Sequence, residues 1–234
     1  MVDGRRGTDL VGSSVVSPST GVPRYGLPAT GSCPGRTAGR YLRLQFPRCL
    51  RTMARLHTLT ASSADDATVV GDVAVLVNTV YALAEKGLWA QGTMRTSPAE
   101  MADYIRSGQI TVAILGDRIV GCIRTQQLDT YTSEFGMLAV AEGHRGTGLG
   151  RELVAFAEQE SLRQGRSTMQ LELLVPRTWS HPSKDFLAGW YPRIGYRIIR
   201  RATIDEYYPR LAPLLATPCD FVVYSKDLTA PSAG

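Results

Sequence analysis

The sequence predicts an α/β domain with a mixed, mainly antiparallel central sheet that is flanked by helices. Two observations support this fold class. Apolar runs of strand length alternate with amphipathic helical patterns between residues 55 and 225. The early runs follow one another across a short turn, which is typical of antiparallel pairing, whereas a long helix separates two later runs, as a parallel crossover requires.

The domain is expected to begin with a strand and a long helix. Residues 55–61 alternate between apolar and polar side chains, as in a strand, and residues 62–66 supply helix-capping side chains. A helical pattern follows and ends near Gly87. Its apolar positions are Val69, Val73, Leu76, Val77 and Val80.

A second helix and a hairpin are expected next. The run Ser-Pro-Ala-Glu at residues 97–100 supplies a cap, a proline in the first turn and a glutamate in the third position, so it predicts a helix that runs to about Ser107. Residues 110–115 and 118–126 are apolar runs on either side of a Gly-Asp turn. They therefore predict a β-hairpin.

The most informative stretch is an apolar strand, residues 133–140, that breaks into a glycine-rich turn at residues 146–150. An amphipathic helix follows at once and stops at Gly165. The first turn of a helix has unpaired backbone N–H groups and the positive end of the helix dipole, so it suits a phosphate. Arg145 and Arg151 add fixed positive charge. The pattern therefore predicts an anion site.

The last elements are expected to complete the sheet. Residues 169–175 form an apolar strand, and a short helix is predicted from Pro182 to Tyr191. Residues 194–199 and 219–225 are the last predicted strands, with a long insertion between them.

Domain boundaries follow from composition. Residues 1–52 are rich in Gly, Pro, Ser, Thr and Arg and lack periodicity, so we expect a disordered basic extension; residues 53–228 form the domain, and residues 229–234 a disordered tail. Three origins of the extension compete: translation from a misassigned start with Met53 the true one, an organelle transit peptide, or a basic regulatory arm. The many Gly and Pro residues argue against the amphipathic helix of a transit peptide, and the misassigned start is favoured.

The net charge of +5 does not indicate nucleic-acid binding by the domain. Residues 1–52 carry eight Arg, no Lys and two Asp, a charge of +6, so the remaining residues carry −1. The domain therefore gives no electrostatic reason to expect DNA or RNA as a partner. No apolar run is long enough to predict a membrane span.

Cysteine and histidine usage does not predict a metal site or a disulfide framework. The four cysteines contain no C-x-x-C pair, and the three histidines are scattered. Cys122 and Cys219 lie in apolar runs and are interpreted as small core residues. We expect a reducing, cytoplasmic location.

Two motifs carry a resemblance to a known family. The turn reads R-x-x-G-x-G from Arg145 to Gly150; it lacks the G-x-G-x-x-G spacing of a dinucleotide fingerprint and the G-K-[ST] of a Walker loop. It resembles the acyl-CoA pyrophosphate loop of the GCN5-related N-acetyltransferase (GNAT) family. Residues 191–196 then match the family's Y-x-x-x-G-[FY] motif, in the right order.

The resemblance implies an acyl-CoA N-acyltransferase fold, whose sheet is splayed between the fourth and fifth strands to receive the pantetheine arm of acetyl-CoA. The residues it assigns to the pyrophosphate are Arg145, Gly146, Thr147, Gly148, Leu149, Gly150 and Arg151. A backbone N–H from Leu138, Ala139 or Val140 is expected to polarise the acyl carbonyl. The family often has Asn seven residues before the motif tyrosine; this position is Lys184, so an asparagine contact is replaced by a lysine that reaches a phosphate or a carboxylate.

Acetyl transfer to an amine requires a base and a donor to the leaving thiolate. An amine with a pKa near 10.4 must lose a proton at neutral pH. Glu134 is the candidate base, in competition with a purely structural role in a salt bridge, and Asp129, Glu172 and His181 are reserves. Tyr191 matches the tyrosine that in this family often donates a proton to the coenzyme A sulfur; the alternative is an aromatic residue that packs under the coenzyme. Tyr196 is interpreted as core.

The function expected from these features is direct acetyl transfer from acetyl-CoA to an amine, small-molecule or peptide, without a metal. Homodimer formation is possible. The acidic and aromatic run at residues 205–208 suggests a cationic amine, whereas a contact from Arg95 favours an acceptor with a carboxylate, and Trp89 is equally ambiguous. The rival functions are a catalytically silent acyl-CoA-binding sensor and a nucleic-acid-binding protein that uses its basic extension.

Overall fold

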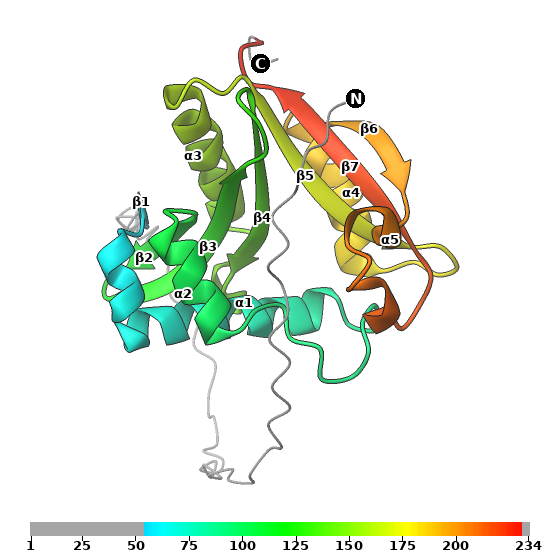
Figure 1. Cartoon of the computed structure of the whole chain (residues 1–234), viewed down its shortest axis with the longest axis horizontal. Coiled ribbons are helices and arrows are strands. Elements are labelled where there is room, and N and C mark those ends of the chain that lie inside the picture. The colour runs from blue at the N-terminus through cyan, green and yellow to red at the C-terminus, as the bar shows by residue number, and fades with distance from the viewer. Residues whose placement is uncertain (1–53, 231–234) are drawn as a thin grey trace, which may run out of the picture. The chain divides into compact units, whose positions relative to one another are not determined.

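The computed structural model describes residues 54–230, whose strands form one sheet in the order β1-β2-β3-β4-β5-β7-β6 (Figure 1). The strands are Arg55–Thr58 (β1), Ile110–Leu115 (β2), Arg118–Gln127 (β3), Thr132–Val140 (β4), Thr168–Pro176 (β5), Arg197–Ala202 (β6) and Cys219–Asp227 (β7). Neighbouring strands pair antiparallel, except β4 and β5, which pair parallel. The predicted fold class is confirmed. The predicted extension, residues 1–52, lies outside the described residues, as does most of the tail expected at 229–234.

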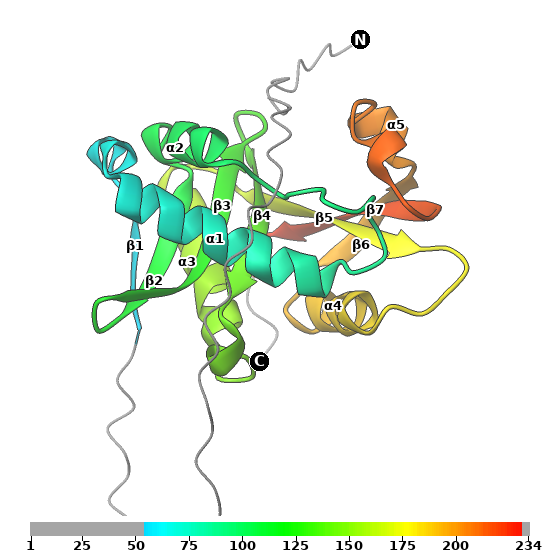
Figure 2. The ribbon, with the colours of Figure 1, turned by 90° about the horizontal axis from the view of Figure 1, so that it is seen from below.

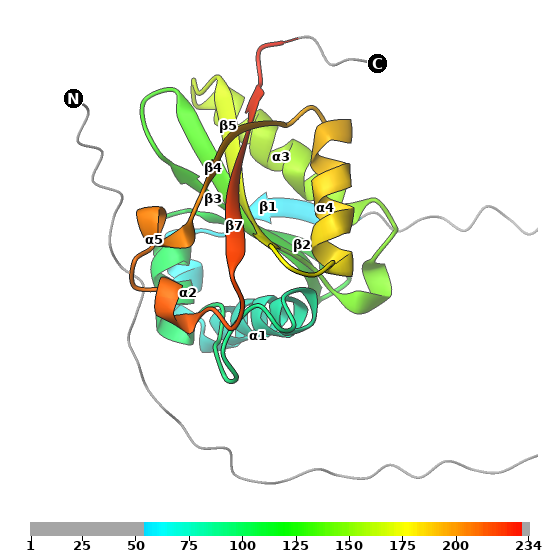
Figure 3. The same ribbon diagram turned by 90° about the vertical axis from the view of Figure 1, so that its right-hand side faces the viewer.

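Helices cover both faces of the sheet (Figures 2 and 3). Helices α1 (Ala67–Ala84) and α2 (Pro98–Arg106) lie on one face with the short α5 (Ile204–Tyr207). Helices α3 (Leu149–Arg163) and α4 (Pro182–Arg193) lie on the other. Because α3 crosses over that face, β5 returns parallel to β4.

Local capping explains where the first two helices begin. The Asp66 carboxylate accepts hydrogen bonds from the backbone N–H groups of Thr68 and Val69 at the start of α1. At the start of α2, the Ser97 hydroxyl accepts from the Glu100 N–H and the Glu100 carboxylate accepts from the Ser97 N–H. This is the capping box that the sequence predicted.

The pairing of β4 with β5 is short, and this shapes the site. It comprises three residue pairs, from Thr132 with Thr168 to Glu134 with Gln170. Beyond them β4 runs on to Val140 without pairing with β5, although β5 stays paired with β7 along its whole length. The strands diverge, as Figure 1 shows, and we call the space between residues 135–140 and 171–176 the β4–β5 gap. The splay implied by the family resemblance is confirmed.

A β-bulge bends β4 beside this gap. The partners Cys122 with Ala139 and Arg124 with Gly136 enclose one more residue on β4 than on β3. Within the bulge Met137 has a φ of 47°, in the left-handed region. A bulge interrupts the ladder and re-aims the backbone. The carbonyl of Met137 faces the Cys122 thiol, with Sγ 3.8 Å from the oxygen.

Two predicted strands differ from the structure. β1 ends at Thr58 rather than at residue 61, because residues 61–65 turn into a short 3₁₀ helix. The strand expected at 194–199 occupies 197–202 instead, since Gly195, with a φ of 97°, is needed to end the turn after α4. β6 is the edge strand and is almost entirely exposed, so it has little of the apolar pattern from which a strand is predicted.

Helix α1 differs from the expectation that no apolar run is long enough to span a membrane. By length and composition it is long and apolar enough to cross a membrane, with a mean hydropathy of 1.7. In the structure it packs against β3 and β4, with Val73 and Val77 fully buried. The buried face of this apolar helix is thus part of the core of the described residues. Cys122 and Cys219 are both buried, as predicted.

Gly121 on β3 is expected to be needed for packing. A Cβ added there lies 3.1 Å from Leu153 Cδ1 and 3.2 Å from the carbonyl oxygen of Ala139. Gly121→Ala should therefore lower the free energy of unfolding by about 1–3 kcal/mol, the usual cost of overpacking. Gly136→Ala, on β4, is the matched control, because an added Cβ meets nothing within 4 Å. Equal stability of the two variants in urea unfolding would contradict this account.

Candidate functional site

The glycine-rich turn places an exposed helix N-terminus at one end of the β4–β5 gap. Gly146 and Gly148 have φ values of 73° and 96°, which glycine adopts without strain. Gly148 is the N-cap of α3 and supplies no side-chain hydrogen bond to the first helical turn. The first N–H groups of α3 are thus not occupied by their cap.

The charges around this turn suit an anion. Arg145 and Arg151 are exposed, and within residues 54–230 neither forms an ion pair. Thr147 donates its hydroxyl to the carbonyl of His144 at 2.8 Å, which tightens the turn before α3. An added Cβ at Gly146 meets nothing within 4 Å, so the turn is open. The predicted anion site therefore has the expected conformation.

Backbone direction narrows the candidates for carbonyl polarisation. Ala141 donates its N–H to the carbonyl of Val120 on β3. Since successive N–H groups of a strand point to opposite sides, the N–H of Val140 points toward the gap and that of Ala139 toward β3. Leu138 lies in the bulge, where the regular ladder is interrupted. Val140 is thus the best placed of the three predicted donors, since the N–H of Leu138 interacts with the Tyr81 hydroxyl.

Tyr191 lies beside the start of the gap. Its side chain is 5% exposed, and its ring centroid is 6.2 Å from that of Phe135 and 5.6 Å from that of Tyr224. Burial raises the pKa of its hydroxyl far above the ordinary value, so this group stays protonated at neutral pH. The structure thus places both predicted features, a protonated phenol and an aromatic packing surface, in one residue.

Glu134 is buried, with one carboxylate oxygen free of a described partner. Gln126 on β3 donates its amide to Oε1 at 2.8 Å, while Oε2 is buried without a hydrogen bond. The side chain is 7% exposed. In the described part of the chain it forms no salt bridge, so the structural alternative of an ion pair is not what holds it. A buried carboxylate oxygen without a partner is costly, and a ligand proton is one way to satisfy it.

The comparison with family models decides the assignment. Residues 106–198 match the model described as Acetyltransferase (GNAT) domain. The chain contains a GNAT acetyltransferase domain. The matched segment spans β2 to the beginning of β6, and so it includes the glycine-rich turn, the β4–β5 gap and Tyr191. No curated protein matched the sequence.

Solved structures share the fold of the GNAT domain at low identity. An aminoglycoside 6'-N-acetyltransferase complexed with coenzyme A is 13% identical, with a TM-score of 0.58 over 76% of this chain and 98% of that one. The ribosomal-protein-S18-alanine N-acetyltransferase from Escherichia coli is 15% identical, with a TM-score of 0.53 over 78% and 98%. The protein yncA from Salmonella typhimurium, solved with its cofactor acetyl-CoA, is 13% identical, with a TM-score of 0.52 over 77% and 99%.

Tyr81 lies before the matched segment and was not predicted from the sequence as a site residue. It lies on α1 and interacts electrostatically with Tyr191, and Arg95 lies over its ring at 5.1 Å from the centroid. Burial raises the pKa of its hydroxyl to about 12, against opposing effects of Arg95 and the backbone N–H of Leu138. The phenol therefore faces the bulge from the α1 side. Tyr81 follows Val80 in the apolar helical pattern. Only its hydroxyl group distinguishes it from an ordinary core residue in the sequence.

Lys184 reaches a carboxylate, one of the two partners considered for it. Its ammonium lies 2.6 Å from Oε1 of Glu85, the residue that ends α1, and both side chains are at least nine-tenths buried. Trp89 donates its indole N–H to Oε2 of Glu85 at 2.6 Å. Burial alone raises the pKa of Glu85, but Lys184, Arg95 and these hydrogen bonds outweigh it and lower the pKa. The ion pair ties the end of α1 to the start of α4 across the two faces of the sheet.

The reserve bases have other surroundings. Asp129 accepts backbone hydrogen bonds from Tyr131 and Thr132, both at 2.8 Å, so it fixes the β3–β4 turn. Glu172 accepts a hydrogen bond from the Tyr208 hydroxyl at 2.8 Å. His181 is buried, with 5% of its surface exposed, and its ring lies 5.3 Å from that of Trp179.

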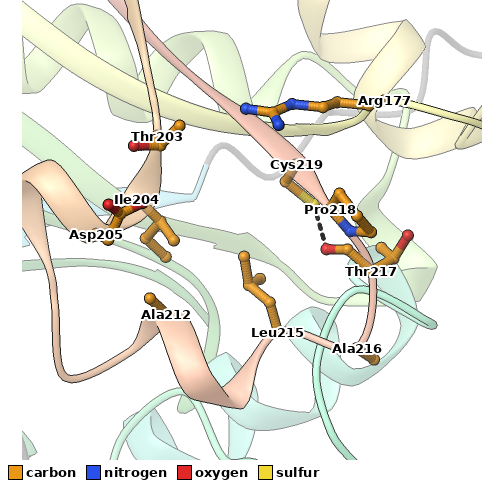
Figure 4. A pocket seen from close by; sticks show the side chains of 10 residues that line it. All are labelled: Arg177, Thr203, Ile204, Asp205, Ala212, Leu215, Ala216, Thr217, Pro218 and Cys219. Atoms are coloured by element: carbon orange, nitrogen blue, oxygen red, sulfur yellow. Dashed lines mark hydrogen bonds between the residues drawn. The ribbon is translucent and has the colours of Figure 1, made fainter.

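The insertion between β6 and β7 forms a pocket of about 340 Å³ (Figure 4). Ile204, Leu215 and Cys219 are among its lining residues, and Arg177 and Asp205 lie at its margin. Arg177 is at the end of β5, seven residues beyond Gln170, the partner of Glu134; this is about 23 Å along a strand. The pocket is therefore remote from the candidate base.

The acidic run in the insertion is largely used within the protein. Glu206 accepts from Arg200 at 2.7 Å and from the backbone of Thr203, and the ring of Tyr207 packs on Phe221. The loop before α2 pairs with the insertion: Ala90 donates to the carbonyl of Leu214, and Ala216 to that of Leu88. The two loops thus support each other next to α1.

The Glu85–Lys184 ion pair is expected to stabilise the domain. Lys184→Met leaves a buried carboxylate without its cation, which should lower the free energy of unfolding by about 3–5 kcal/mol. Because the pKa of Glu85 is lowered in the folded state, the loss should be complete above pH about 5 and should fade as the pH falls through that pKa. Urea unfolding at several pH values measures this.

The control for this prediction removes both charges. The double variant Glu85→Gln/Lys184→Met is expected to recover most of the lost stability, since no charge stays buried alone. A Lys184→Met protein as stable as the wild type at pH 7 would show that the ion pair does not hold the two helices together.

Proposed function

We propose that the GNAT domain transfers the acetyl group of acetyl-CoA directly to an amine, without a covalent enzyme intermediate. The observation that carries the proposal is the end of β4–β5 pairing after three residue pairs, next to an open helix N-terminus. The gap supplies an unpaired backbone edge on β4, and the turn next to it supplies an anion site. Acetyl-CoA supplies the acyl group as a thioester, with its diphosphate and its amide-containing arm.

The residues present fit such a molecule. The N–H groups at Gly148, Leu149 and Gly150 and the guanidinium groups of Arg145 and Arg151 would hold the diphosphate. The unpaired edge of β4 would pair with the amide-containing arm, much as a strand accepts an added strand. Gly146 and Thr147 shape the turn, and Ala139 keeps β4 attached to β3. Lys184 supports the start of α4 through Glu85.

Glu134 is proposed as the base. Its Oε2 is buried and without a described partner, so it is available to take the proton of an acceptor ammonium directly or through water. Gln126 fixes the other oxygen and therefore orients the carboxylate. Glu172 lies on the neighbouring strand, but its carboxylate already accepts a hydrogen bond from Tyr208.

Tyr191 is proposed to donate a hydrogen bond to the departing thiolate. Its phenol is protonated at neutral pH and lies beside the gap, against Phe135 of β4. The N–H of Val140 is proposed to polarise the acyl carbonyl, because it points away from β3. The base and the polarising group thus come from β4, and the donor comes from α4.

Gly148 is expected to be essential for binding acetyl-CoA. Gly148→Ala forces a φ of 96° on a residue with a Cβ, which strains the turn or closes it. Calorimetry should show acetyl-CoA affinity reduced at least about tenfold, a cost of 1.4 kcal/mol or more. Gly143→Ala is the control, since this exposed glycine has negative φ and open space. Unchanged affinity in Gly148→Ala would sink the proposed diphosphate site.

Glu134→Gln and Tyr191→Phe are expected to separate catalysis from binding. Each should lower thioester turnover by about 10²–10⁴-fold, the usual contribution of general acid–base groups. Acetyl-CoA affinity should stay within about twofold, because neither side chain belongs to the diphosphate site. Turnover is measured by thiol release over a panel of amines, and affinity by calorimetry. Turnover unchanged in both variants would overturn the assignment, and binding without any turnover in the wild type would favour a silent acyl-CoA sensor.

A further inference from the structure

Two guanidinium groups lie on the α1 side of the sheet without a carboxylate partner in the described residues. Arg124 on β3 donates from Nε to the side-chain oxygen of Gln109 and from Nη2 to that of Gln126, both at 2.7 Å. Arg95, before α2, lies over the ring of Tyr81. Amide oxygens and aromatic rings orient these cations, and Glu85 and Glu134 act on Arg95 and Arg124 respectively without forming an ion pair in the part of the chain that the structure describes.

The two arginines belong to one cluster. Both interact electrostatically with Tyr104 and Tyr208. The guanidinium carbon of Arg124 is 3.9 Å from the centroid of the Tyr104 ring. Burial lowers the pKa of Arg124, and the like charge of Arg95 lowers it further. Arg95 acts electrostatically on Arg124, and neither forms an ion pair within the described residues, so the cluster favours an anionic ligand.

The backbone around Arg95 is firmly held. The side-chain oxygen of Asn78 on α1 accepts hydrogen bonds from the N–H groups of Arg95 and Thr96, at 2.9 and 3.1 Å. The Asn78 amide donates to the carbonyl of Thr96 at 2.9 Å. Arg95 therefore starts from a fixed position, although its side chain is exposed.

The candidate base lies next to these cations. Gln126 accepts from Arg124 and donates to Glu134, so it separates a guanidinium from a carboxylate. Glu134 Oε2 and the Tyr104 hydroxyl are both buried and without a described partner, on residues that are 7% and 8% exposed. Arg124 pairs with Gly136, which lies two residues beyond Glu134 on β4, and two residues of a strand span about 7 Å. The carboxylate oxygen, the hydroxyl and the two guanidinium groups thus lie in one region that a small molecule can contact.

We propose that the acceptor is a small amine that also bears a carboxylate. The inference rests on the proposed acetyl transfer. The carboxylate binds Arg95 and Arg124, whose planar donors suit its two oxygens, and the amine faces Glu134. Two guanidinium groups repel a polycation, so the acceptor class differs from the aminoglycoside named for one structural neighbour. The remote pocket of the insertion is not needed for this acceptor.

Matched acceptors test the proposal. Each standard amino acid is compared with its primary amide and with the amine left by decarboxylation, at fixed acetyl-CoA, by thiol release. The acids should react with at least about tenfold higher kcat/KM than the amides, as expected for loss of a charged hydrogen bond. In Arg124→Gln and Arg95→Gln, the KM for the acid should rise about 10–100-fold and approach that of the amide, with little change in kcat. Arg124→Lys should retain part of the preference.

Controls separate this proposal from the proposed function. Arg106→Gln, on the outer side of α2 and paired with Asp103, should leave every parameter unchanged. Calorimetry of acid and amide against the coenzyme A complex gives a readout that does not depend on turnover. Equal binding and turnover of acids and amides would overturn the carboxylate site while acetyl transfer stands. No turnover with any amine would instead overturn the proposed function. If Arg124→Gln fails to fold, the exposed Arg95 still supports the test.

Discussion

The parallel ladder between β4 and β5 ends after Glu134, and the site depends on this interruption. A strand in the middle of a sheet normally pairs on both sides, and a buried backbone group without a partner costs free energy. β4 keeps its pairing with β3 through a bulge at Met137, while β5 keeps its pairing with β7. The unpaired groups therefore collect in one gap. A ligand with amide groups can satisfy them, so the fold is completed by what it binds.

The gap needs support on both faces of the sheet. On one face Tyr191 packs with Phe135 and Tyr224 in the core under α3 and α4. On the other face α1 crosses β4, and its last residues reach α4 through Glu85 and Lys184. A salt bridge at the surface contributes little, but this one is buried, so removing either partner leaves a desolvated charge. The position where the family often has asparagine thus carries a lysine together with the acid that a buried lysine requires.

The parts predicted from sequence are those with a local cause. The capping box at Ser97 and the glycine turn depend on neighbours in the chain, and both are present. Tyr81 and the partner of Lys184 were not predicted, because Glu85 lies 99 residues from Lys184 and only the fold brings them together. The bulge has no local signal either, since Met137 adopts a φ of 47° that its own side chain disfavours. β6 was misplaced for the opposite reason: an exposed edge strand has little apolar pattern to read.

The coenzyme side and the amine side of the gap differ in how much of their chemistry follows from general features of structure. A helix N-terminus with glycines and arginines suits a phosphate group in many folds, so the turn supports the proposed coenzyme site. The acceptor side has no such general device, and the shared fold says nothing about it. Its information lies in unsatisfied groups: a carboxylate oxygen of Glu134, the Tyr104 hydroxyl and the charges of Arg95 and Arg124. Arg124 is held by amides and Arg95 by an aromatic ring, while Glu134 and Glu85 attract them without an ion pair among the described residues. A ligand carboxylate would bind both cations directly, and this explains the arrangement better than stability alone.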